Sequence, residues 1–165
     1  MQESIFWSDE EDVISHQYAY FSIKGVQYII DFSSDPDLIA NFTELDSRIC
    51  EIVAGHHSYT VKFAVREYYE DHRNNKYLFD APEDHNFGRK DIQQLKEFLE
   101  KFLYEHFKQY QVECYCFIAE RDSLNRMYRK MCKRRHLLLA DFEPIYGLGN
   151  EQNCFIIKTP LYGER

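Results

Sequence analysis

The segment from residue 91 to residue 135 constrains the fold most, because it has the pattern of a helix, a buried strand and a second helix in succession. Residues 112–119 are apolar on both alternating faces, which is typical of a strand covered on both sides of a sheet. Helical spacing returns from Leu124 through Tyr128 to Met131, with Asp122 as the expected N-cap. The chain therefore places a helix on each side of an inner strand. The first helix has apolar residues every three or four positions, which predicts one buried stripe: Ile92, Leu95, Phe98, Leu99, Phe102, Leu103 and Phe107.

The flanking sequence predicts the rest of the sheet. Apolar and polar residues alternate in residues 18–32 on either side of Lys24-Gly25, which predicts a hairpin. Residues 43–54 have the signals of a helix. Apolar and polar residues alternate again in residues 59–69, which predicts a strand with one face exposed to water. Tyr77-Leu78-Phe79 is a candidate short strand, and residues 141–146 and 154–159 are the expected closing pair, with Pro144 favouring a sheet edge for the first. We expect a mixed α+β (α/β) fold with a single-layer, mostly antiparallel twisted sheet of about six or seven strands and helices on both faces. Residues 1–17 are expected to form an acidic N-terminal arm, and residues 18–165 a single α/β domain.

Length and composition limit the classes of protein. A chain of 165 residues fits one core. Its apolar runs fall well short of the roughly 20 residues that cross a bilayer, and the acidic start is unlike a targeting peptide, so we expect a cytoplasmic protein with no membrane partner. The five cysteines are odd in number, and four of them have positions on apolar faces, which is typical of reduced core thiols. No zinc-site spacing is present, so no metal is expected.

Charge is strongly segregated along this acidic chain. Residues 121–135 carry seven basic residues against the single acid Asp122, a local net charge of +6, whereas the whole chain carries −8, which leaves −14 for the remainder. A solvated helix face explains such a run, and so does a site for an anion or an acidic partner. Nucleic acid is a less favoured partner, because the remainder would repel a long phosphate backbone. The candidate anion-binding or partner-binding residues are Arg121, Arg126, Arg129, Lys130, Lys133 and Arg134.

From about Tyr77 onward, the order of strand, helix, strand, helix and closing strand pair resembles the core of the GCN5-related N-acetyltransferase (GNAT) family. The resemblance implies a GNAT-like fold that holds acetyl-CoA, with Gly88, Arg89 and Lys90 around the pyrophosphate and Tyr128 as the acid that protonates the leaving thiolate. A carboxylate near the end of the preceding strand, Glu67, would then be the general base. The loop Asn86-Phe87-Gly88-Arg89 has one glycine where the family usually has two.

The chain also resembles a family of small bacterial proteins known only as a domain of unknown function, through its hairpin, the helix start at Glu120-Arg121-Asp122 and the end of the last strand before Pro160. Because the acetyltransferase signature is incomplete, our leading hypothesis is a non-enzymatic binding or regulatory protein of bacterial or mobile-element origin, with no cofactor, that binds a protein partner. The alternatives are an acyl-CoA-dependent N-acyltransferase and nucleic-acid contact through residues 121–135. The partner could be a second copy, because the acids from Asp9 to Asp12 could meet the basic helix and carry Ile5, Phe6 and Trp7 onto a neighbouring surface.

Overall fold

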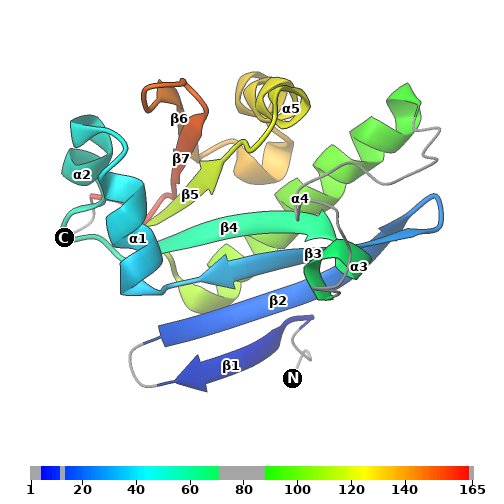
Figure 1. Cartoon of the computed structure of the whole chain (residues 1–165), viewed down its shortest axis with the longest axis horizontal. Coiled ribbons are helices and arrows are strands. Elements are labelled where there is room, and N and C mark those ends of the chain that lie inside the picture. Colours follow the sequence, from blue (N-terminus) through cyan, green and yellow to red (C-terminus); the bar gives the residue numbers. More distant parts are fainter. Residues whose placement is uncertain (1–4, 12–13, 71–87, 164–165) are drawn as a thin grey trace.

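One twisted sheet of seven strands organises the molecule, and the predicted fold class is confirmed. The computed structural model describes residues 5–11, 14–70 and 88–163. The strand order is β1-β2-β3-β4-β5-β7-β6, and the β4–β5 pair is parallel whereas the other five pairs are antiparallel (Figure 1). The strands are β1 (Trp7–Glu11), β2 (Ile14–Ile23), β3 (Val26–Ser33), β4 (Ser58–Val65), β5 (Cys114–Ile118), β6 (Glu143–Leu148) and β7 (Cys154–Lys158).

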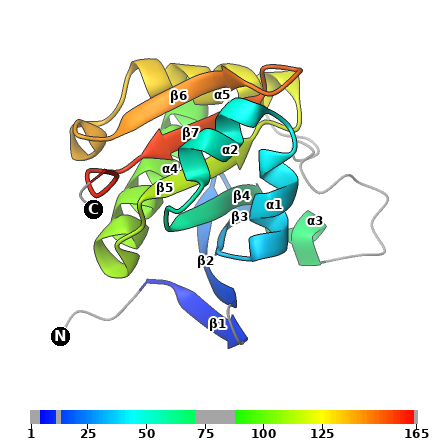
Figure 2. The ribbon, with the colours of Figure 1, turned by 90° about the vertical axis from the view of Figure 1, so that its left-hand side faces the viewer.

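Helices cover both faces of this sheet (Figures 1 and 2). The long helix α4 and helix α5 both pack on the face that carries Tyr115 and Phe117 of β5. The opposite face, with Cys114 and Cys116, is covered by α1 and α2. The helices are α1 (Pro36–Thr43), α2 (Ser47–Val53), α3 (Arg66–Glu70), α4 (Arg89–Tyr110) and α5 (Asp122–Lys133), with a short 3₁₀ turn η1 (Leu137–Leu139) after α5. None of the helices in the described ranges is long and apolar enough to cross a bilayer.

Several local predictions are confirmed. The hairpin between β2 and β3 turns at Lys24-Gly25, where both residues have positive φ, of 50° and 79°. Strand β5 lies between β4 and β7 with both faces buried, as expected for an inner strand. Pro144 lies in the edge strand β6, which has an irregular register toward Leu148. The five cysteines are free thiols, and four of them are buried.

Other boundaries differ from the predictions. The strand expected at residues 59–69 ends at Val65, and α3 follows. Within β4 both faces are buried except at Lys62, because α1 covers the face that was expected to be wet. The N-cap of α5 is Arg121, one residue before the expected Asp122. The helix predicted at residues 43–54 is α2, which begins at Ser47 with Asp46 as its cap, and the preceding helix α1, capped by Asp35, was not predicted. The candidate strand at residues 77–79 and the loop up to residue 87 lie outside the described residues.

The N-terminal segment belongs to the sheet. Residues 7–11 form β1 at the edge beside β2, and three strands separate it from β5. Phe6 is buried, with ring centroids 5.6 Å from Phe32 and 6.1 Å from Phe102, whereas Trp7 is 63% exposed. Asp9 lies 3.9 Å from the imidazole of His16, so the structure does not bring this acid to the basic helix. The expected docking of the apolar residues occurs within one chain, through Phe6.

A buried polar network crosses the core between α4 and the sheet. His106 is fully buried and stacks on Phe32 with ring centroids 4.0 Å apart. Its Nε2 lies 2.7 Å from Gln17 Oε1, which can only accept, so Nε2 carries the proton and Nδ1 accepts from the Tyr115 hydroxyl at 2.7 Å. This tautomer is neutral, and burial lowers the pKa of His106 to about 3.

We therefore expect His106 to destabilise the fold in acid. Because the folded pKa of about 3 lies below the ordinary value of 6.5, the stabilisation is fully present above pH 6.5 and is lost as pH falls toward 3. The expected loss between pH 7 and pH 5 is about 2 kcal/mol of unfolding free energy. Urea unfolding of the wild type and of His106→Gln across this range measures the difference. Identical pH dependence in the two proteins would contradict the assignment of a neutral histidine.

Candidate functional site

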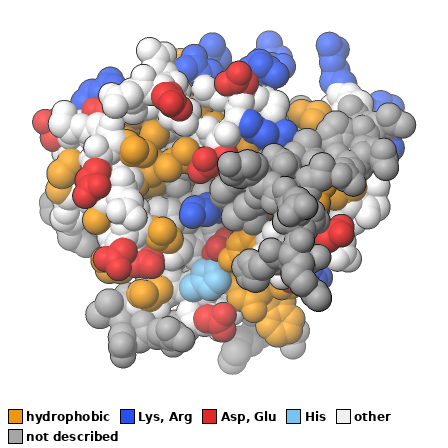
Figure 3. Space-filling model, in the orientation of Figure 1, with side chains coloured by type: hydrophobic (Ala, Val, Ile, Leu, Met, Phe, Trp, Pro, Cys, Tyr) orange, Lys and Arg blue, Asp and Glu red, His pale blue; other side chains and the backbone are white. Residues whose placement is uncertain are grey.

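A groove between α4 and α5 gathers the strongest concentration of positive charge in the described chain. It has a volume of about 770 Å³, and no carboxylate is among the described residues that line it. Figure 3 shows Lys and Arg side chains along the edge of the molecule where α5 lies in Figure 1. Below, the cationic groove means this groove and its six basic residues: Arg89, Lys96, Arg126, Lys130, Lys133 and Arg134.

Helical spacing aligns these side chains along the groove. On α4, Arg89, Ile92 and Lys96 are separated by three and four positions and so share one helix face. On α5, Arg126 and Lys130 are four positions apart, on a face different from the one that buries Leu124 and Tyr128. Each helix therefore presents one polar face to the groove.

One contact holds the two sides of the groove together. Lys96 Nζ donates to the backbone carbonyl of Arg134 at 2.6 Å and lies 3.5 Å from Glu100 Oε1. Glu100 is itself buried and accepts from the backbone N–H of His136. Lys96 is thus partly neutralised by Glu100. The other five cations have no acidic partner among the described residues, which leaves their charge available to an anion.

The floor of the groove is partly apolar. Ile92 and Met127 line it, and Ile92 is 43% exposed although the sequence predicts it in the buried stripe of the helix. An exposed apolar side chain between cations suits a ligand that has both acidic and apolar groups.

The structure brings together some of the predicted site residues and separates others. Arg126, Lys130, Lys133 and Arg134 line the cationic groove, together with Arg89 from the predicted pyrophosphate set. Two residues of the predicted anion-binding set, Arg121 and Arg129, do not line it. Arg121 Nη1 donates to Ser123 Oγ at 3.0 Å, and Arg129 donates to Asn125 and to the carbonyl of Gln152.

Among the six basic residues of the cationic groove, Lys96 is the one that the sequence analysis did not predict as a site residue. Lys96 lies seven positions after Arg89, which places both side chains on one face of the helix. This spacing was the signal in the sequence that could have identified Lys96. The signal becomes meaningful only when α4 and α5 are known to lie side by side.

The start of α4 has a different electrostatic environment. Gly88 is the N-cap, and its backbone N–H donates to Asp91 Oδ2 at 2.9 Å, so a carboxylate already occupies this donor. Asp91 also lies 3.7 Å from Lys24 Nζ. Lys90 is exposed and does not line the groove. Of the predicted set Gly88, Arg89 and Lys90, only Arg89 lies in the groove.

A second hollow lies where β4 and β5 diverge, and we call it the interstrand cavity. The two strands pair in register from Ser58 and Cys114 as far as Val61 and Phe117, and beyond this point β4 continues without β5. The cavity of about 250 Å³ is lined mainly by apolar side chains from α1, β4, β5 and α5, and it shares no lining residue with the cationic groove.

Tyr128 lines this cavity and is 5% exposed. Burial raises the pKa of its hydroxyl well above the ordinary value of 10, so the group remains a neutral donor at physiological pH. Glu67, the predicted base, is exposed in α3 and lines neither the interstrand cavity nor the groove. The predicted acid and base thus lie in separate surroundings.

The fold and these hollows define a mixed α+β protein with a cationic groove on one side of α5 and an apolar cavity beside it. The chain matches no protein-family model, no curated protein and no solved structure.

Proposed function

We propose that this protein is a non-enzymatic binding module on an acetyltransferase-like scaffold, and that its cationic groove binds an acidic segment of a protein partner. The observation that supports this most is a groove with six cations and no carboxylate among its described lining residues, on a chain whose net charge is −8. Opposite charge in a groove accelerates association and selects acidic partners. Ile92 and Met127 add apolar contact, so the preferred segment alternates acidic and apolar residues.

The proposal is tested with a fluorescently labelled peptide of alternating glutamate and leucine. We expect saturable binding in fluorescence anisotropy at low salt, and a loss of affinity as salt screens the exposed charges. A single-stranded oligonucleotide of similar length and charge is the comparison, and we expect it to bind more weakly because the acidic remainder of the surface repels it. Stronger binding of the oligonucleotide would favour the nucleic-acid alternative, and binding of neither would exclude an anion-binding role.

A second copy of the chain is one possible source of the acidic segment. Sedimentation of the wild type and of a groove variant tests this. A dimer that dissociates when groove charges are reversed would identify self-association through the groove, whereas a dimer unaffected by the change would place its contact elsewhere.

Acyl-CoA binding is a second candidate function, favoured by one observation. The interstrand cavity and the cationic groove lie on either side of the first turns of α5, so an apolar thioester and a phosphorylated nucleotide could be held by one protein. If acetyl-CoA binds, a concentration 100 times its dissociation constant should add about 2.7 kcal/mol to the unfolding free energy. A thermal-shift titration measures this, and an unchanged melting temperature at millimolar acetyl-CoA would exclude the function.

A further inference from the structure

The interstrand cavity has features of a small-molecule site that are independent of the cationic groove. Its walls include Phe42 from α1, Ile118 from β5 and Leu124 from α5. They come from both faces of the sheet, because the cavity occupies the opening between β4 and β5. A concave site with apolar walls and few polar groups is typical of small-ligand binding.

One polar group in this cavity is available to a ligand. The Tyr128 hydroxyl makes no hydrogen bond to any described residue, although the side chain is only 5% exposed. A ligand acceptor in the cavity would accept a hydrogen bond from this hydroxyl.

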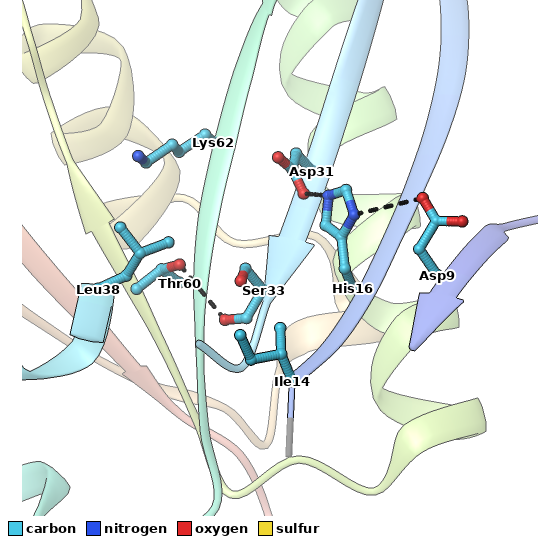
Figure 4. A pocket seen from close by; sticks show the side chains of 8 residues that line it. All are labelled: Asp9, Ile14, His16, Asp31, Ser33, Leu38, Thr60 and Lys62. Carbon is cyan, nitrogen blue, oxygen red and sulfur yellow. Dashed lines mark hydrogen bonds and ion pairs between the residues drawn. The ribbon is translucent and has the colours of Figure 1, made fainter. Parts of the chain in front are cut away.

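A second polar group is a lysine left without its cross-strand partner. Lys62 of β4 stands directly opposite Asp31 of β3, where opposite charges normally pair. Asp31 instead pairs with His16 and accepts a hydrogen bond from the Tyr69 hydroxyl at 2.9 Å. In Figure 4 the Asp31 carboxylate lies beside His16, whereas Lys62 extends away from both. Lys62 therefore has no acidic partner among the described residues.

His16 explains why Asp31 is not available to Lys62. Its hydrogen bond to Asp31 raises the pKa of His16, and Asp9 adds attraction from the other side of the ring (Figure 4). The Asp31 carboxylate is thus held by His16 and is not free to pair with Lys62. Lys62 is exposed and lines both this polar hollow and the interstrand cavity.

We propose that the interstrand cavity binds a small carboxylic acid with an apolar body, whose carboxylate accepts hydrogen bonds from the Tyr128 hydroxyl and the Lys62 ammonium. A cavity of about 250 Å³ has room for roughly eight non-hydrogen atoms, taking about 30 Å³ for each. The apolar body lies against Phe42, Ile118 and Leu124. Glu120 also lines the cavity and is exposed, as Lys62 is, so water weakens both its repulsion of the carboxylate and the attraction of Lys62.

Isothermal titration calorimetry with hexanoate and hexanamide tests the proposal, because the two probes fit the cavity, share an apolar body and differ in charge. We expect the wild type to bind the acid at least about tenfold more tightly than the amide. Lys62→Met should remove this preference, and Lys62→Arg should retain most of it. Tyr128→Phe should weaken binding of the acid while preserving the packing of the ring. Lys101→Met, at an exposed position of α4 that lines neither hollow, is the matched control and should leave both affinities unchanged.

The proposal is overturned if the amide binds as tightly as the acid, if Lys62→Met leaves the affinity for the acid unchanged, or if the acid shows no binding at about 10 mM. Leu124→Trp, which fills the cavity, gives a further test because binding of both probes should then be lost. Retained binding in this variant would place the site elsewhere on the protein.

Discussion

The double variant Arg126→Glu/Lys130→Glu is expected to bind the acidic peptide about 100-fold more weakly than the wild type. Each reversal removes one attraction and introduces one repulsion, and each such exposed contribution is up to about 1 kcal/mol. Both side chains line the cationic groove, are exposed, and have no acidic partner among the described residues, so their reversal should leave the fold intact. Fluorescence anisotropy at low salt measures the change.

The matched control for this prediction is Lys90→Glu/Lys101→Glu. Both lysines are exposed on α4 and line neither the groove nor the interstrand cavity, so this variant changes the net charge by the same amount at other positions. We expect a loss of at most a few-fold, from the change in long-range attraction. Equal losses in the two variants would show that net charge, and not the groove, determines binding.

The second large effect concerns stability. Phe6→Ala is expected to lower the unfolding free energy by about 3–5 kcal/mol, as core truncations of phenylalanine do. Phe6 is buried, and its ring lies within 6.4 Å of the rings of Phe32, Phe102, His106 and Tyr110. Removing it would leave a cavity above the buried histidine network, and thermal or urea unfolding measures the loss.

Trp7 provides the control for this prediction, because it is the adjacent residue and is 63% exposed. Trp7→Ala is expected to change the unfolding free energy by about 0.5 kcal/mol or less. Deletion of residues 1–12 should destabilise the protein at least as much as Phe6→Ala, because it also removes β1. A deletion variant as stable as the wild type would show that Phe6 and β1 contribute nothing to the fold.

Long periodic segments made much of the fold predictable. The stripe from Leu95 to Phe107 spans several helical turns, and the alternation around Lys24-Gly25 specifies a hairpin with its register. Helix α1 was missed because Asp35-Pro36 was interpreted as a break. Asp35 in fact accepts from the N–H of Asp37, and Pro36 occupies the first helical position, where its missing N–H costs nothing.

The sites were less predictable, because they depend on which elements become neighbours. The basic residues of α5 are visible in the sequence, but the contribution of Lys96 depends on α4 packing beside α5. The availability of Lys62 depends on Asp31 pairing with His16 from another strand. The exposed face predicted for β4 is covered because α1 lies over it, which periodicity within β4 does not encode.

The central claim is that an acidic segment binds between α4 and α5, and paramagnetic relaxation tests it most directly. An acidic peptide with a nitroxide label is added to the isotope-labelled protein, and line broadening is mapped along the backbone. We predict strong broadening around Ile92, Lys96, Arg126 and Lys130, and none in β1 at the other edge of the sheet. Broadening centred on β1 or on the α1–α2 face, with the groove unaffected, would contradict the claim.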